Sequence, residues 1–308
     1  MRVLAQNLHP YLFTERASVS PLQYCYAVMF CCILLACAGH AHSEPFTIAV
    51  PKDVHEDFLK LLGERDPISI DRYDGPGSRR DVVEVLLMHQ ALSLGGFQGD
   101  IKVVSFDGYK RTVQKVQLGH FGAFGPSAWE SAMTRQENTL LFTEPLILEG
   151  EFEAGLYTSP RNKKALAIKD FSGLYDLSSV SNRNWEKDWT LLESMNLKQI
   201  HHTLHWISMA KMVAAQRVDF VLAPFPPRED LIIKVNDIEL IPIPGLKVYL
   251  SGSRRWIVSA HHSQGQEAYD AIQNGLRQLR EKGLVTRAYI ESGFFNRLTR
   301  DWSRYQRK

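Results

Sequence analysis

The sequence predicts an α/β protein, because short apolar segments alternate with segments of helical periodicity. Apolar strands are expected at 46–50, 101–106 and 120–124. Helices are expected at 79–94 and 108–118, each between two of these strands. This alternation up to residue 126 predicts a parallel sheet whose strands are joined by helical crossovers. A chain of 308 residues is long enough for one large domain or for two lobes with sizeable cores.

The first elements carry recognisable boundaries. The strand at 46–50 closes at Pro51, which begins a loop. Residues 68–73 alternate apolar and polar side chains, so a strand is expected there, ending at the turn Asp74-Gly75-Pro76-Gly77. Ser78 is expected to cap the helix at 79–94, and Gly95-Gly96 is expected to end it.

The stretch 119–146 holds the best candidate for a binding site. The strand at 120–124 is expected to break at Gly125-Pro126, and Ser127 and Trp129 follow where the chain emerges. A turn then carries Arg135, ahead of an apolar segment that starts at Leu140. Ligands of α/β sheets gather outside the carboxyl ends of strands, so these side chains could form part of a small-molecule site. The alternative is that Trp129 packs in the core and Arg135 is solvated.

The second half of the chain continues the α/β pattern. Residues 144–157 are extended and acidic, as in a strand that leaves one lobe for another. Further strands are expected at 178–181, 218–223, 238–243, 246–250 and 255–259, and helices at 185–195 and 206–216. Ser263 is expected to cap a long amphipathic helix that Gly283 interrupts.

Composition is ordinary for a globular protein, with 44% hydrophobic and 23% charged residues. The formal net charge of +2 gives no reason to expect a nucleic-acid or membrane-surface partner. We find no basic run, low-complexity tract or internal repeat.

The N-terminal region predicts export. Residues 24–38 form an uncharged apolar run followed by small residues, so residues 1–41 are interpreted as a cleaved signal peptide. A transmembrane anchor is the alternative, but the run is shorter than the roughly 18 to 20 residues that a span needs. The four cysteines (Cys25, Cys31, Cys32 and Cys37) lie in this segment, so disulfides, thiol catalysis and cysteine-bound metals are not expected in the mature protein. Lipidation at Cys37 is a minority interpretation.

Three local patterns suggest a family. Arg135 is followed by Phe142-Thr143-Glu144-Pro145, residues 216–222 read Gln-Arg-Val-Asp-Phe-Val-Leu, and residues 275–283 precede Tyr289 and Asp301-Trp302. In this order the patterns resemble the turn, the buried strand and the closing helix of bacterial family 3 extracellular solute-binding proteins, which have the type II periplasmic-binding fold. The resemblance covers roughly residues 46–302.

The resemblance implies two lobes joined by crossovers near 144–150 and 248–254. Lobe 1 would combine residues 44–147 with 253–308, and lobe 2 would hold 148–252. A ligand would lie in the cleft between the lobes, which would close by a hinge motion. The implied function is a periplasmic, monomeric, non-enzymatic protein that captures a small polar solute, anionic or amino-acid-like, for an ABC permease. No cofactor and no metal are expected.

Two departures from the family pattern bear on the ligand. Arg135, which the resemblance implies as the carboxylate anchor, lies one residue further from Phe142 than is usual in the family. The family places an acid for the ligand ammonium just after the buried strand of lobe 2, where this chain has Ala223-Pro224-Phe225. An α-amino acid is therefore in doubt as the ligand. Asp219 is expected to be structural, as in the family.

The candidate ligand-binding residues come from several expected turns. They are Tyr73, Ser127, Trp129, Arg135, Asn182 and Trp185. The two aromatic rings in lobe 1 would stack on a ligand, Ser127 would donate a hydrogen bond, and the amides from Asn182 to Trp185 would offer a helix N-terminus to an anion. The alternatives are core or rim packing, ordinary turn chemistry, and capping by Asn184. His201, His202 and His205 lack an acid or cysteine that would complete a metal site.

Two other classes of function stay open. Glu149, Glu151 and Glu153 would face one side of a strand, which is typical of a solvated face rather than of an acid–base pair. No nucleophile elbow, phosphate loop or zinc-protease motif is present, although some cyclohexadienyl dehydratases share the fold, so an exported lyase is an alternative. The other alternative is a ligand-sensing module that acts in trans on an inner-membrane partner.

Overall fold

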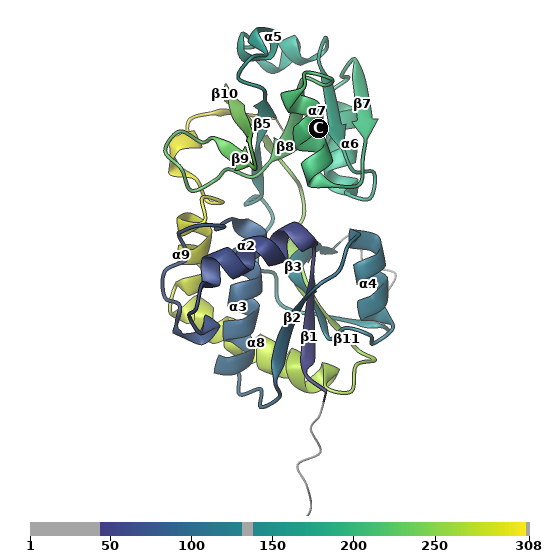
Figure 1. Cartoon of the computed structure of the whole chain (residues 1–308), viewed down its shortest axis with the longest axis vertical. Helices are drawn as coiled ribbons and strands as arrows, with labels where there is room; N and C mark the ends of the chain where they lie inside the picture. Colours follow the sequence, from purple (N-terminus) through teal and green to yellow (C-terminus); the bar gives the residue numbers. More distant parts are fainter. Residues whose placement is uncertain (1–43, 131–137, 306–308) are drawn as a thin grey trace, which may run out of the picture. The chain divides into compact units, whose positions relative to one another are not determined.

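The computed structural model describes residues 44–130 and 138–305. The expected signal peptide and Arg135 lie outside these ranges. The described chain forms two β-sheets, each covered by its own helices (Figure 1). None of the helices in the described ranges is long and apolar enough to cross a membrane.

The first sheet contains five strands in the order β2-β1-β3-β11-β4. They are β1 (Phe46–Val50), β2 (Ile101–Ser105), β3 (Ala123–Trp129), β4 (Leu140–Phe142) and β11 (Arg254–Ser259). β1 pairs in parallel with both β2 and β3, which confirms the predicted parallel arrangement of the first strands. β11 returns from late in the sequence and pairs antiparallel with β3 and β4, so it completes the sheet.

Five helices among the described residues accompany the first sheet: α2 (Lys52–Leu62), α3 (Arg80–Leu94), α4 (Tyr109–Gln117), α8 (Gly265–Glu281) and α9 (Leu284–Glu291). Two of them, α3 and α8, pack closely through small residues. A Cβ on Gly95 would lie within 3.0 Å of the Ala271 backbone, and a Cβ on Gly275 would do the same to Ala91. The backbones of α3 and α8 therefore touch, and the two helices lie side by side (Figure 1). Most residues of α3 are buried.

The expected strand at 68–73 is wrong. A short 3₁₀-helix, η1 (Pro67–Ser69), begins this stretch, and the rest is irregular. Burial does not alternate here: Ile68 is exposed, while Ile70 and Tyr73, three residues apart, pack into the core beside α3, where the Tyr73 hydroxyl donates to Gln90 at 2.9 Å. Ser78 does not cap α3, because its hydroxyl donates to the Tyr73 carbonyl at 2.5 Å.

The expected break at Gly125-Pro126 is also wrong, because β3 runs through both residues. Gly125 is required there since a Cβ would lie 2.7 Å from Val50. The pairing of β3 with β11 shifts register between Arg255 and Ile257, beside the proline that lacks an amide hydrogen. The irregular pairing lets the strand continue to Ser127 and Trp129.

The second sheet contains seven strands, with the path β12-β10-β5-β8-β6-β7 and β9 paired to β10. The strands are β5 (Glu153–Thr158), β6 (Ser178–Ser181), β7 (Gln199–His202), β8 (Phe220–Ala223), β9 (Ile233–Val235), β10 (Ile238–Tyr249) and β12 (Ser303–Tyr305). The helical segments are α5 (Lys163–Leu166), η3 (Phe171–Leu174), α6 (Glu186–Ser194), α7 (Trp206–Ala214) and η4 (Arg297–Thr299), of which α6 and α7 match the two predicted helices. Asp219 accepts from Asn162 and Ser178, in keeping with its expected structural role.

The chain passes between the sheets three times. It leaves β4 for β5 and returns from β10 to β11, which confirms the two predicted crossovers. It then passes from α9 to β12, which pairs in parallel with β10. We propose that each sheet with its helices is one lobe; residues 303–305, expected in lobe 1, pair with the second sheet.

Candidate functional site

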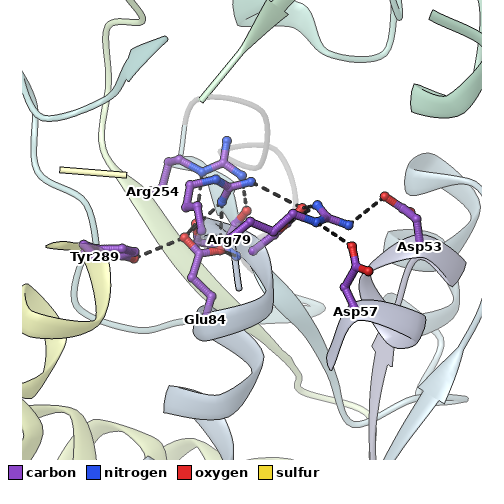
Figure 2. A network of polar contacts seen from close by, with 9 residues as sticks. Asp53, Asp57, Arg79, Glu84, Arg254 and Tyr289 are labelled. Atoms are coloured by element: carbon purple, nitrogen blue, oxygen red, sulfur yellow. Dashed lines mark hydrogen bonds and ion pairs between the residues drawn. The ribbon is translucent and has the colours of Figure 1, made fainter. Parts of the chain in front are cut away.

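A completely buried carboxylate organises the end of β3. Glu84, in the first turns of α3, accepts from Arg80 at 2.8 and 3.0 Å and from the Ser127 amide and hydroxyl at 2.7 and 2.8 Å. The Tyr289 hydroxyl donates to the same carboxylate at 3.1 Å (Figure 2). These donors come from α3, β3 and α9, so one side chain ties three elements together. Burial of Glu84 is tolerable because it is paired and fully hydrogen-bonded.

Arg254, the first residue of β11, extends this network. Its Nε donates to the Ser127 hydroxyl at 3.0 Å, and its Nη2 donates to the Ser127 carbonyl. Its guanidinium lies over the Trp129 ring, 4.6 Å from the centroid. The Arg254 and Arg80 guanidinium carbons lie 5.4 and 5.5 Å from the centroid of Phe152. Two cations therefore share one aromatic ring at the first crossover.

Positive charge is in excess in this network, which contains the guanidiniums of Arg80 and Arg254 and the carboxylate of Glu84. Burial and the neighbouring Arg80 cation lower the pKa of Arg254 to about 10, while Glu84 opposes the shift. Glu84 pairs directly with Arg80 alone, and Arg254 reaches this carboxylate only through Ser127. The Arg80 Nε is buried and has no hydrogen-bond partner within the described ranges. An anion placed near the two guanidiniums would offset the excess positive charge.

A second carboxylate, on a helix of the second sheet, interacts electrostatically with the two arginines. Asp188, in the first turn of α6, has its pKa raised to about 6 by burial, against the opposing effects of Arg254 and Arg80. In the described part of the chain no cation lies within 4.0 Å of its carboxylate. Lys187, the preceding residue, approaches the crossover at Gly252, since a Cβ there would lie 3.6 Å from its Nζ.

A separate cluster anchors the start of α3. Arg79 pairs with Asp53 at 2.8 Å, Asp57 at 3.0 Å and Asp81 at 2.6 Å (Figure 2). Burial raises the pKa of Asp53, although Arg79 opposes the shift. Because Arg79 is saturated by these carboxylates, the cluster ties α2 to α3 and offers no free cation to a ligand.

The expected lobe 1 residues differ in their surroundings. Ser127 and Trp129 belong to the network described above, but Trp129 is only 6% exposed, with its ring against Arg254 and 5.0 Å from Phe152. Tyr73 is completely buried and bonds Gln90, so its ring serves the core. Whether these residues touch a ligand stays a prediction.

The expected lobe 2 residues form a local turn. The Asn182 side chain donates to the Leu204 carbonyl at 3.1 Å and accepts from the Asn184 amide at 2.9 Å. Trp185 precedes α6 and packs against the apolar core of the second sheet. Neither residue is hydrogen-bonded to the Glu84 network within the described ranges.

Sequence reasoning missed Arg80, Glu84, Asp188 and Arg254. The available signal was weak: the arginine pairs at 79–80 and 254–255 each stand at the start of an apolar element, where a surface charge is the usual interpretation. Only the fold brings these pairs to one place.

The three glutamates considered from sequence have structural partners. Glu149 and Glu151 do not lie on a strand, which corrects the expected alternation. They accept from the Tyr249 hydroxyl and the Leu148 amide, while Glu153 pairs with Lys247 at 2.8 Å. Among residues 44–130 and 138–305 there is no group of three or more His, Cys, Asp or Glu side chains that could hold a metal.

Solved structures share this arrangement of two sheets. The probable amino-acid ABC transporter extracellular-binding protein ytmK from Bacillus subtilis matches with a TM-score of 0.54 and 12% identity, over 84% of this chain and 99% of that one. The periplasmic VFT2 domain of BvgS from Bordetella pertussis matches with a TM-score of 0.51 and 16% identity, over 79% and 91%. The chain has the type II periplasmic-binding-protein fold.

The periplasmic-binding fold is also that of the ancestral amino-acid-binding protein AncCDT-1, a precursor of cyclohexadienyl dehydratase. Its TM-score is 0.51 and its identity 12%, over 80% of this chain and 96% of that one. No protein-family model and no curated protein matches the sequence. The resemblance to family 3 solute-binding proteins is therefore confirmed at the level of the fold.

Proposed function

We propose that this protein is an exported solute-binding protein that holds a small anionic ligand between its two lobes. The observation that carries the proposal is the pair Arg80 and Arg254, two guanidiniums on one aromatic ring; Arg80 pairs with the buried Glu84, and Arg254 is linked to that carboxylate through Ser127. The pair lies where the first crossover meets β3 and β11, so a ligand there would contact the segment that joins the lobes. Such a contact would favour closure of the lobes around the ligand.

The proposed setting is the periplasm, with an ABC permease as the membrane partner that receives the ligand. Support comes from the name of ytmK, which assigns that protein to an amino-acid ABC transporter. The VFT2 domain belongs instead to the periplasmic part of BvgS, and this supports a second candidate, sensing in trans. Loss of uptake of the ligand when the gene for this protein is deleted favours transport, while intact uptake favours sensing.

We propose that the protein is not an enzyme, although a lyase is kept as an outcome of the test. Mass spectrometry of the ligand recovered after incubation should find it unchanged. Turnover would move the protein to the lyase class represented by the descendants of AncCDT-1.

A thermal-shift screen of the full chain against small anionic solutes tests the binding proposal. At least one solute should raise the melting temperature by several degrees at about 100 times its dissociation constant, because a ligand that binds only the folded state stabilises it by mass action. Arg254→Gln should remove the shift. Arg228→Gln, which changes an exposed arginine paired with Asp230, should keep it. A folded protein that no solute stabilises would contradict the proposal.

A further inference from the structure

The first crossover contains an exposed turn between two fixed points of the chain. Toward the first sheet, Ile147 is bridged to Arg254 of β11, whose amide donates to the Ile147 carbonyl at 2.9 Å. Toward the second sheet, the Phe152 carbonyl accepts from the Leu250 amide at 3.0 Å. Residues 148–150 are exposed, and the last of them is a glycine with φ of 94°. A change of backbone angles here would turn one sheet against the other, as in a hinge.

Tyr249, the last residue of β10, ties this crossover turn (residues 148–151) to the second sheet. Its hydroxyl donates to the Glu149 carboxylate and accepts from the Gly150 amide at 3.1 Å. Within the turn, the Leu148 amide donates to the Glu151 carboxylate at 2.6 Å, and the Glu151 amide donates to the Leu148 carbonyl at 3.2 Å. The conformation of the turn therefore depends on where the Tyr249 hydroxyl lies.

The C-terminal segment reaches the ring of the same tyrosine. β12 pairs in parallel with β10 and places Arg304 opposite Lys247. The Arg304 guanidinium carbon lies 5.2 Å from the centroid of the Tyr249 ring, and its Nη1 lies 3.5 Å from the Glu153 carboxylate. Lys247 pairs with that carboxylate at 2.8 Å. An arginine of the last strand thus covers the ring whose hydroxyl holds the crossover turn.

The C-terminal segment also contacts the crossover at a second point. Phe294, shortly after α9, has its ring centroid 5.1 Å from that of Phe152, the residue that follows the crossover turn. At the other end of the segment, the Tyr305 hydroxyl donates to the Ser194 carbonyl of α6 at 2.7 Å, and its ring lies 5.2 Å from Phe171. One end of the segment is therefore packed on the crossover, and the other is fixed to the second sheet.

We propose that residues 293–305 form a strap that restrains the hinge between the lobes, with Arg304 acting on the crossover turn through Tyr249. While the guanidinium covers the Tyr249 ring, the hydroxyl stays on Glu149 and Gly150, and the turn keeps its backbone angles. Without the guanidinium the ring leaves the turn more often, and the hinge opens more often. The inference goes beyond the proposed function, because the strap acts with or without a ligand.

The contacts of Arg304 are weak enough for the hinge to open reversibly. Its side chain is 43% exposed and that of Glu153 is 24% exposed, so solvent screens their ion pair. A cation over an aromatic ring and a screened ion pair together change an opening equilibrium by about tenfold. This restraint is large enough to measure and small compared with the stability of a folded domain.

Hydrogen exchange of the full chain, followed at the Gly150 amide, tests the contact. Arg304→Gln should make this amide exchange about tenfold faster than in the parent. Tyr249→Phe, which removes the hydroxyl, should also accelerate it. The double variant should exchange no faster than Tyr249→Phe alone, because Arg304 acts through that hydroxyl. Arg300→Gln, at an exposed arginine of the same segment, should behave as the parent.

Distances between spin labels on the two lobes test the restraint itself. The labels are attached at Lys110→Cys of α4 and Lys211→Cys of α7, both exposed, in a full chain whose four native cysteines are replaced by serine. Arg304→Gln should broaden the distribution of distances beyond the range of the parent. Arg300→Gln should leave the distribution unchanged.

The outcomes separate the strap from a local contact, from general unfolding and from the proposed function. Unchanged exchange at Gly150 in Arg304→Gln, or effects that multiply in the double variant, would overturn the contact through Tyr249. Faster exchange with an unchanged distribution of distances would overturn the restraint of the lobes. Equal acceleration at the buried Val221 amide of β8 would show general unfolding and also contradict the strap. Failure of every solute in the thermal-shift screen overturns the proposed function and leaves this inference standing.

Discussion

Glu84 shows how a buried charge is held at the scale of one residue. It has no exposed surface, and its two oxygens accept from Arg80, Ser127 and Tyr289. The same contacts raise the pKa of Tyr289 well above its ordinary value, with burial as the main cause and the Glu84 charge next. Each donor would be left partly unsatisfied if the carboxylate were lost.

Glu84→Gln should therefore destabilise the protein. The amide loses the ion pair with Arg80 and turns N–H groups toward donors, which should lower the free energy of unfolding by about 2 to 4 kcal/mol. Urea unfolding followed by circular dichroism measures the change. Glu64→Gln, at an exposed position, is the control and should cost less than about 0.5 kcal/mol. Equal stability of the two variants would show that Glu84 is not energetically coupled to its donors.

Asp188 should make stability depend on pH in the direction opposite to a paired carboxylate. Burial raises its pKa from 3.8 to about 6, so between these values the folded protein binds more protons than the unfolded chain. Its contribution to stability is therefore greatest at low pH and is lost as the pH rises toward about 6.

Asp188→Asn tests this contribution. The variant should melt at a higher temperature than the parent at about pH 7.5, and the difference should shrink toward about pH 4. Thermal melts of both proteins across this range check the sign. A variant that melts lower than the parent at neutral pH would contradict the raised pKa.

At the scale of elements, α3 is held by close approach to α8. Gly95 and Gly275 each stand against an alanine of the other helix, Ala271 and Ala91, at backbone contact. This packing keeps α3 buried and carries Arg80 and Glu84 to the end of β3. The position of the site therefore depends on glycines distant from it in the sequence.

Gly275→Ala should push the two helices apart. The added methyl group would lie within 3.0 Å of the Ala91 backbone, so overpacking should lower the free energy of unfolding by about 1 to 3 kcal/mol. Asn274→Ala, one residue earlier on the exposed face of α8, is the matched control. Because alanine favours helix over glycine, a stabilised Gly275→Ala protein would show that the helices can separate without cost.

Element predictions were most accurate where local pattern and tertiary environment agree. The strands β1 and β6 occupy the predicted residues, and Gly283, with φ of 69°, separates α8 from α9 as expected. The strand predicted at 68–73 is wrong because the apolar and polar alternation of the sequence does not match the burial: Ile68 is exposed, while Ile70 and Tyr73, three residues apart, are buried. The break predicted at Gly125-Pro126 is wrong because a register shift between β3 and β11 accommodates Pro126 within β3.

At the scale of the whole molecule, a third connection joins the sheets. After α9 the chain passes Gly293, where a Cβ would meet the Pro226 backbone, and Asn296 donates to the Pro226 carbonyl at 3.3 Å. Trp302 then packs its ring 5.6 Å from Phe225, and β12 completes the edge of the second sheet. The C-terminal segment thus leads from α9, beside the first sheet, into the second sheet.

Truncation after Arg300 should weaken the second lobe. It removes Trp302 and the β12 pairing with β10, and should lower the free energy of unfolding by about 2 kcal/mol or more. Truncation after Tyr305 retains both features and is the control. Calorimetry of the two truncated proteins measures the difference, and identical melting curves would show that the third connection carries no stability.

The sequence alone determined the α/β class, because periodicity and turn residues act between near neighbours in the chain. Its resemblance to a solute-binding family implied the two crossovers. The tertiary structure decided which charges meet. Arg254 and Ser127 are 127 residues apart, and Tyr289 and Glu84 are 205 apart, yet each pair is hydrogen-bonded. No local sequence pattern predicts such long-range hydrogen bonds, since they arise from strand order and helix packing. The candidate site is therefore a property of the fold, while its side chains individually resemble ordinary surface charges.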